Sequence, residues 1–259
     1  GADPASVQLA ITRFKREAEV AASLRSPHTV ELYDFGVTED QALYFVMEML
    51  DGMDLERLVR RYGELPPGRV VYLLGQVCES LEEAHVRGLV HRDIKPSNIH
   101  VGRLGLRHDF VKVLDFGLVK QVDGKGGGQT GATAEGIVPG TPDYMAPEMT
   151  MNQRIDGRTD LYAVGCVAYY MLTARPVFEA ANVFHMISRH LNEVPVPPSR
   201  VAKQPIPPEL EQVILACLAK SPEDRPRSAT ELARALEAVP AEPWGEAQAA
   251  EWWRTNPIA

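Results

Sequence analysis

The sequence predicts an α+β fold in which short strands in the first half of the chain give way to helices in the second. Two apolar runs, at residues 29–35 and 42–50, are typical of neighbouring strands of a small sheet, and helical periodicity dominates beyond Gly52. The 259 residues are 45% hydrophobic and 24% charged, which is enough to bury a sizeable core. This length fits one large domain or two lobes.

The first element expected is a helix over residues 12–24, where Phe14, Ala18 and Ala21 recur at helical spacing before Ser26-Pro27 closes the segment. The two strands of the small sheet follow. A long helix is then expected from Pro66-Pro67 to Gly88, because proline favours the first turn of a helix and glycine the position after its end.

Two short strands, at residues 99–101 and 110–114, interrupt the helices, and an irregular segment runs from 115 to about 146. Loops of that length are usually functional or disordered. Further helices are expected in the second half, at residues 159–173, 182–190, 208–219 and 228–238, the last opened by a Ser228–Glu231 capping box. The Trp252-Trp253 pair is expected to pack against the body of the protein.

Charge and cysteine content exclude several classes of function. Lys and Arg number 27 against 35 Asp and Glu, and the net charge of −8 disfavours binding to nucleic acid, so the expected partners are proteins or small molecules. Cys78, Cys166 and Cys217 form no C-x-x-C pair, which favours a reducing compartment and hence a cytoplasmic location. The nearly uncharged run 161–174 is too short to span a bilayer, and no membrane segment is expected.

Three motifs follow one another along the chain. Residues 91–98 read H-R-D-I-K-P-S-N, residues 115–117 read D-F-G and residues 146–148 read A-P-E. Over residues 13–238 the sequence resembles the eukaryotic-type protein kinase superfamily, in particular its bacterial Ser/Thr kinases. The resemblance implies a two-lobed protein-kinase-like fold and transfer of the ATP γ-phosphoryl group to Ser or Thr of protein substrates.

The resemblance assigns catalytic roles to residues of these motifs. Asp93 would orient the substrate hydroxyl and accept its proton, and Lys95 would meet the transferring phosphoryl group as a point charge. Asn98 and Asp115 would hold Mg²⁺, so ATP and magnesium are the implied cofactors. Thr141 would lie beside Asp93 and help to seat the acceptor hydroxyl.

It also assigns a nucleotide pocket. Met47 would guard the back of the adenine pocket, and backbone groups of Glu48 and Leu50 would bind adenine. His100 would lie beneath the adenine ring, where the family usually has Leu or Met. Glu17 matches the helix carboxylate that pairs with a phosphate-clamping strand lysine.

Other matched residues are implied to be structural. Asp160 would cap the helix that follows it and accept hydrogen bonds from the catalytic-loop backbone. Glu148 would pair with Arg225, and His91 and Phe116 would be core residues.

Regulation by phosphorylation is also implied. Arg92 would bind a phosphate on the segment after D-F-G, with Thr133 as the first candidate phosphosite and Thr130 as the second. Bacterial relatives often autophosphorylate as dimers, which makes a homodimer an expected partner.

Two family features are missing from the N-terminal part. Gly1 and Gly36 are the only glycines in the first 50 residues, so no G-x-G-x-x-G loop is present, and Lys15 is the only lysine before Lys95. Lys15 lies two residues from Glu17 on the expected helix, where the side chains do not face each other. Little transfer is therefore expected from the chain as given.

Two explanations compete for these departures, namely a truncated kinase or a degenerate fold that binds without catalysing. Truncation is favoured because all four motif residues with chemical roles are retained and the chain does not begin with Met. The expected division is then a partial N-lobe over 1–50, a complete helical C-lobe over 51–240 and a tail over 241–259. A pseudokinase scaffold and a small-molecule phosphotransferase remain as alternatives, and the peptide-seating segment 140–148 speaks against the second.

Overall fold

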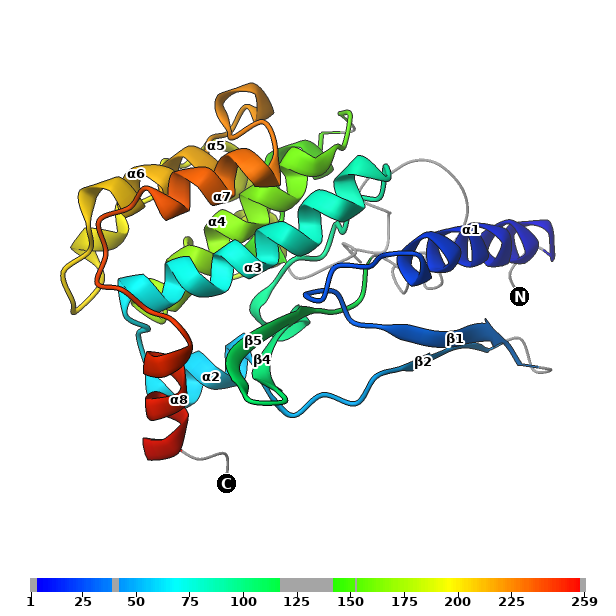
Figure 1. The fold of residues 1–259 in the computed structure, drawn as a ribbon. Helices are drawn as coiled ribbons and strands as arrows, with labels where there is room; N and C mark the ends of the chain where they lie inside the picture. Colours follow the sequence, from blue (N-terminus) through cyan, green and yellow to red (C-terminus); the bar gives the residue numbers. More distant parts are fainter. Residues whose placement is uncertain (1–3, 39–41, 117–141, 152, 257–259) are drawn as a thin grey trace.

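The computed structural model describes residues 4–38, 42–116, 142–151 and 153–256. Figure 1 shows a body of helices α3 to α7 beside two small sheets, with α1 near the ribbon of β1 and β2 and α8 at the opposite side of the molecule. The α+β fold predicted from the sequence is confirmed. The elements follow one another as α1 (Pro4–Ala22), β1 (Leu32–Val37), β2 (Leu43–Met47), β3 (Gly52–Asp54), α2 (Leu55–Tyr62), α3 (Pro67–Val86), η1 (Pro96–Asn98), β4 (Ile99–Leu104), β5 (Arg107–Val113), η2 (Pro142–Tyr144), η3 (Pro147–Met149), α4 (Gly157–Thr173), α5 (Val183–Asn192), η4 (Pro198–Arg200), α6 (Pro208–Cys217), η5 (Pro222–Asp224), α7 (Ala229–Glu237) and α8 (Glu246–Thr255).

The predicted helices and strands are present, and two boundaries differ in an informative way. Helix α1 begins earlier than expected, at Pro4. Helix α4 begins at Gly157, because the side chain of Asp156 caps it by accepting a hydrogen bond from the backbone N–H of Arg158. The prediction that Asp160 caps this helix is therefore wrong, since Asp160 lies inside the first turn.

The strands form two antiparallel sheets. Strands β1 and β2 pair as a ribbon, and β3, β4 and β5 form a second sheet in that order. A parallel bridge between Thr29 and Val113 joins the segment before β1 to β5. In the β4–β5 pair Gly102 faces Phe110 while Arg103 faces His108, so Asp109 is an extra residue that forms a bulge in β5.

The core is centred on helices α3 and α4. Helix α4 is apolar on nearly all sides, as expected of a helix enclosed by other elements, which confirms the prediction that residues 161–174 form a buried helix. The three cysteines are free and buried, and burial raises the pKa of the Cys217 thiol to about 12. Within the described ranges, every helix is too short or too polar to cross a membrane.

A buried ion pair joins the η3 turn to the loop after α6. Arg225 donates to both carboxylate oxygens of Glu148, at 2.7 and 2.8 Å, and the two side chains are 0% and 1% exposed. The predicted Glu148–Arg225 pair is thus confirmed. In helix α7, Ser228 caps the N-terminus as predicted, whereas Glu231 accepts from the N–H of Arg227.

Candidate active site

Asp160 fixes the backbone of the loop that carries the H-R-D motif. Its carboxylate, 1% exposed, accepts hydrogen bonds of 2.8 Å from the backbone N–H groups of His91 and Arg92. The Nε2 atom of His85 lies 2.8 Å from the same carboxylate. Arg92 has a φ of 63°, a left-handed conformation that is costly for a residue with a side chain. The hydrogen bonds to Asp160 help to hold this strained turn. They confirm the prediction that the Asp160 carboxylate accepts hydrogen bonds from the backbone of this loop.

His91 links the loop to the end of β5. Its Nε2 lies 2.6 Å from the carbonyl oxygen of Leu114, and its Nδ1 lies 3.2 Å from the backbone N of Asp93. Burial lowers the pKa of His91, so the ring is neutral, donating from Nε2 and accepting at Nδ1. The ring also stacks against Phe116, with centroids 4.6 Å apart, and both residues are buried as predicted.

The Asp93 carboxylate lies between a cation and an amide. Its Oδ2 atom is 3.1 Å from Nζ of Lys95 and 3.2 Å from Nδ2 of Asn98, which also donates to the carbonyl of Asp93 at 2.9 Å. The side chains of Asp93 and Lys95 are 17% and 23% exposed, so a substrate can reach them. The structure therefore brings these three predicted residues together.

Asp115 lies next to Asn98 through the backbone. The N–H of Leu114 donates to the carbonyl of Asn98 at 2.9 Å, and Asp115 follows with an exposed side chain and a φ of 53°. Because the Asn98 amide nitrogen points at Asp93, its oxygen is the atom available for a cation. A carboxylate and an amide oxygen are hard donors that suit Mg²⁺, so these two residues fit the metal that the family implies.

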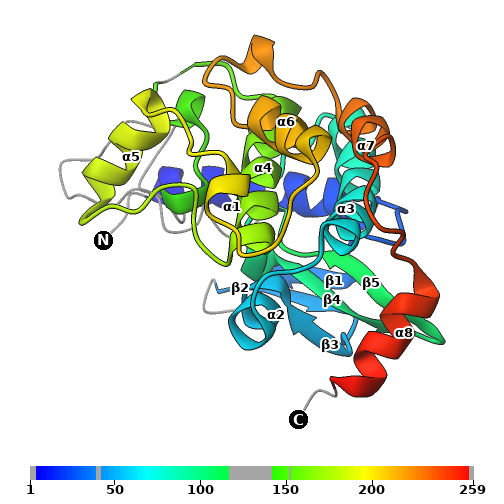
Figure 2. The same ribbon diagram turned by 90° about the vertical axis from the view of Figure 1, so that its left-hand side faces the viewer.

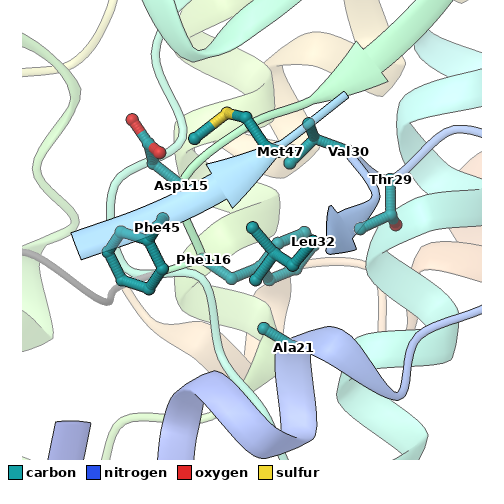
Figure 3. Close-up of a pocket in the computed structure, with 8 residues that line it drawn as sticks. All are labelled: Ala21, Thr29, Val30, Leu32, Phe45, Met47, Asp115 and Phe116. Atoms are coloured by element: carbon teal, nitrogen blue, oxygen red, sulfur yellow. The ribbon is translucent and has the colours of Figure 1, made fainter. Parts of the chain in front are cut away.

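A small pocket lies between α1, the β1–β2 ribbon and the D-F-G segment (Figure 3). Its walls are apolar except for Asp115 and Thr29, and Ala21 of α1 lies opposite Met47 and Asp115 in this view. The lining consists of Ala21, Thr29, Val30, Leu32, Phe45, Met47, Asp115 and Phe116. Met47 thus lies beside Asp115, which is compatible with its predicted place at the back of the adenine pocket.

Glu48 is held by a network that the sequence did not predict. Its backbone N–H donates to the carbonyl of Glu31 at 3.0 Å, and its carboxylate accepts from the N–H of Glu31 at 2.8 Å. Nζ of Lys112 lies 2.5 Å from the same carboxylate and 3.3 Å from the carbonyl of Thr29. The only signal in the sequence was a lysine within the apolar run of β5.

His100 lies on β4 opposite Asp54 of β3, with its ring against Gly52. A Cβ atom on Gly52 would come within 2.7 Å of that ring, so the glycine makes room for it. Burial lowers the pKa of His100 and keeps the imidazole neutral. Leu50, the second adenine-binding candidate, is half-buried between β2 and β3.

Of the remaining predicted residues, the structure describes Glu17. Glu17 is half-buried on α1, and Lys15 on the same helix is exposed. Thr141, Thr133 and Thr130 lie outside the described residues.

The fold, the fixed H-R-D loop and the cluster around Asp93 together define a protein kinase domain. Residues 4–236 match the sequence model of the protein kinase domain. The chain belongs to the protein kinase family, whose members transfer phosphoryl groups from ATP.

The relatives are bacterial Ser/Thr protein kinases. The serine/threonine-protein kinase pkn3 of Myxococcus xanthus is 42% identical over 232 residues, which cover 88% of this chain and 42% of that protein. PknB of Mycolicibacterium smegmatis is 37% identical over 223 residues, which cover 85% of this chain and 34% of that protein. The chain therefore spans less than half the length of these relatives.

Two solved structures share the fold. A double mutant of the Mycobacterium tuberculosis PknI kinase domain superposes with a TM-score of 0.68 at 29% identity, covering 91% of this chain and 81% of that one. Rad53, solved in complex with AMP-PNP, gives a TM-score of 0.65 at 26% identity, covering 86% of this chain and 53% of that one.

Proposed function

We propose that this chain is a catalytic domain that transfers the γ-phosphoryl group of ATP to Ser or Thr hydroxyls of proteins. The observation that carries the proposal is the Asp93 carboxylate, held by Lys95 and Asn98 in a loop whose backbone Asp160 fixes. The similarity to bacterial Ser/Thr kinases supports this choice of acceptor.

In the proposed reaction, Asp93 accepts the proton of the substrate hydroxyl as its oxygen attacks the γ-phosphorus. The bond between the γ-phosphorus and the β–γ bridging oxygen breaks, and ADP leaves with that oxygen. Lys95, whose Nζ is 3.1 Å from the same carboxylate, stabilises the negative charge of the phosphoryl oxygens. The Asn98 amide keeps Asp93 turned toward the acceptor. Thr141 is proposed to seat the acceptor hydroxyl.

The nucleotide and metal are proposed to bind beside this cluster. Mg²⁺, held by Asn98 and Asp115, would neutralise charge on the ATP phosphates. Backbone groups of Glu48 and Leu50 would bind adenine, with His100 beneath the ring and Met47 at its back.

We also propose that the chain as given transfers slowly. A strand lysine would clamp the ATP phosphates and pair with Glu17. The only lysine before Lys95 is Lys15, which is exposed on the same helix as Glu17 and does not match that position. Residues 1–50 would then act as a partial N-lobe, 51–240 as the C-lobe and 241–259 as a tail. The alternative function is a pseudokinase scaffold that binds partners without phosphorylating them.

Control by phosphorylation forms part of the proposal. A phosphate on Thr133, or failing that on Thr130, would be bound by Arg92 and would order the segment that precedes Thr141. Autophosphorylation in a homodimer would supply that phosphate.

The test measures Mg-ATP binding and transfer from γ-labelled ATP to a generic basic protein. Asp93→Asn should retain nucleotide binding and lose transfer by about 10²-fold or more, the usual contribution of a general base. Glu209→Gln, an exposed carboxylate on α6, is the matched control and should not change either quantity. Measurable transfer at the same rate by Asp93→Asn and the unmodified chain would overturn the assignment.

A fusion that supplies a G-x-G-x-x-G loop and a strand lysine ahead of Pro4 separates the two candidate functions. Faster transfer by the fusion, abolished again by Asp93→Asn, would support the kinase. A fusion that binds Mg-ATP and transfers nothing would favour the scaffold.

A further inference from the structure

Residues 241–256, here called the tail segment, pack against the back of the β4–β5 hairpin. They lie beyond the residues that match the protein kinase domain, which end at 236. In Figures 1 and 2 helix α8 of this segment lies beside β5, and Glu246 at its start pairs with Arg107 of β5 at 2.8 Å. The segment contains all of the tryptophans in the protein, Trp244, Trp252 and Trp253.

Two of these tryptophans bind a buried carboxylate. Asp109 is fully buried, and each of its oxygens accepts one hydrogen bond from Arg69, at 2.7 and 2.9 Å. The indole N–H of Trp253 donates to Oδ1 at 2.7 Å and that of Trp244 to Oδ2 at 2.9 Å. The tail segment therefore supplies half of the donors that satisfy this carboxylate.

The third tryptophan covers the partner of Asp109. The guanidinium carbon of Arg69 lies 3.8 Å from the ring centroid of Trp252, a cation–π contact, and Arg69 is 0% exposed. A buried ion pair is stable only when its remaining hydrogen-bonding groups are also satisfied. The indole N–H groups of the tail segment do this for Asp109, whereas Nη1 of Arg69 is buried without a hydrogen-bond partner among the described residues and the guanidinium meets the ring face of Trp252 instead.

The start of helix α3 is shaped for the tail segment. A Cβ atom on Gly68 would lie 2.0 Å from the carbonyl oxygen of Glu242, so no side chain fits there while the tail segment is docked. Gly75, on the same helix, has open space around it.

Asp109 occupies a strained position in the strand that leads to the candidate active site. It forms the bulge of β5 with a φ of 51°, and the strand continues through Lys112 to Val113, two residues before Asp115. The bulge sets the register of the residues beyond it, because one extra residue changes which side chains face each side of the sheet. Gln76 of α3 also stabilises the bulge. Its amide NH₂ donates to the carbonyl of Asp109, and its amide oxygen accepts from the N–H of Val111.

We propose that the tail segment is a functional part of the catalytic domain. In this proposal Asp109, held by the indole N–H groups of Trp244 and Trp253, is a positioning residue for Asp115. The docked tryptophans hold the bulge in β5 in its strained conformation. They thereby hold the strand that leads to Asp115, which would bind the metal. The consequence for metal binding rests on the proposed function, whereas the consequence for the strand does not.

The first experiment displaces the tail segment without touching the ion pair. Gly68→Ala should shift tryptophan emission to the red, because all tryptophans of the protein lie in the segment that it pushes away. Gly75→Ala is the matched control, since it makes the same change on the same helix where nothing is in contact. The emission of this control should equal that of the unmodified chain.

The second experiment removes the two donors and follows the strand by amide hydrogen exchange. The N–H groups of Val111, Val113 and Leu114 are hydrogen-bonded and exchange only when the strand opens. In the double variant Trp244→Phe with Trp253→Phe, these N–H groups should exchange about tenfold faster. This corresponds to a loss of ~1.4 kcal/mol in the free energy of strand opening. Trp252→Phe keeps a ring over Arg69 and removes no donor to Asp109, so it should change exchange little.

The third measurement tests positioning of the metal ligand. The Mg²⁺ concentration for half-maximal nucleotide binding should rise several-fold in the double variant and not in Trp252→Phe, while binding of metal-free nucleotide stays constant. Unchanged exchange at Val111, Val113 and Leu114 in both Gly68→Ala and the double variant would overturn the proposal. Failure of the unmodified chain to bind Mg-nucleotide would count against the proposed function alone, since the exchange result still decides the role of the tail segment.

Discussion

Single residues set the geometry of the candidate site from outside it. Asp160 contributes no reacting atom, yet its carboxylate accepts two backbone N–H groups of the H-R-D loop and meets the His85 ring. The sequence predicted the backbone contacts through the family resemblance. It did not identify His85, because the local sequence around a histidine in the last turn of a helix does not indicate which residue it will contact in the folded chain.

Asp160→Asn tests this arrangement. An asparagine has one acceptor oxygen, and its NH₂ group would face a donor, so at least one bond to the loop is lost. We expect the free energy of unfolding to fall by about 1.5–3 kcal/mol, the usual worth of a hydrogen bond to a charged group. Urea unfolding measures this loss, and transfer should fall further than stability because Asp93 is no longer held in place. A variant as stable as the unmodified chain would contradict the role given to Asp160.

At the scale of elements, most helices and strands were predicted, and two of the shortest, β3 and α2, were missed. Helix α3 carries several turns of apolar periodicity and α4 is one long apolar run, and each is a strong signal. Strand β3 has three residues and α2 eight, too few for periodicity to distinguish a strand or helix from a loop. Both form because packing against β4 and the core stabilises them, and packing cannot be read from a local pattern.

The link between Glu48 and β5 is a second feature of element scale that can be tested. The side chains of Lys112 and Glu48 are 11% and 14% exposed, so removing one leaves the other charge largely desolvated. We expect Lys112→Met to lower the free energy of unfolding by about 3 kcal/mol. Adding Glu48→Gln should restore part of this loss, which a double-mutant cycle in urea would measure. Strictly additive losses would show that the two side chains do not interact.

At the scale of the whole molecule, the motifs predicted the family, the residues around Asp93 and the distant Glu148–Arg225 pair, but not the contacts of the tail segment. The Arg69–Asp109 pair and the docked tryptophans join residues 40 or more positions apart. Arg69 and Asp109 are each of a type usually found on surfaces, so nothing in their local sequence indicated burial. Their partners are defined only when the tail segment returns to α3 and β5.

The pH dependence of stability is also a property of the whole molecule, and His190 should contribute to it. The ring is 2% exposed between Tyr162 and Phe178, with the hydroxyl of Tyr162 2.8 Å from its Nδ1. Lys220 donates to its carbonyl oxygen at 2.7 Å, which adds a positive charge nearby. Burial, followed by that charge, lowers the pKa of His190 from 6.5 to about 4.

Because the pKa of His190 is lower in the folded state, the unfolded chain binds the proton more tightly. Stability is therefore full above pH 6.5 and falls as the pH drops toward 4, by about 1.4 kcal/mol per pH unit from this residue. Between pH 6.5 and 5 the loss is about 2 kcal/mol, and the lowered pKa values of His28, His91 and His100 add to it. Urea unfolding from pH 5 to 7.5 should show this dependence of the unfolding free energy on pH. In His190→Asn, whose amide oxygen can still accept from Tyr162, the slope should be smaller by the contribution of one bound proton. Equal slopes for the two proteins would mean that His190 does not titrate as its burial requires.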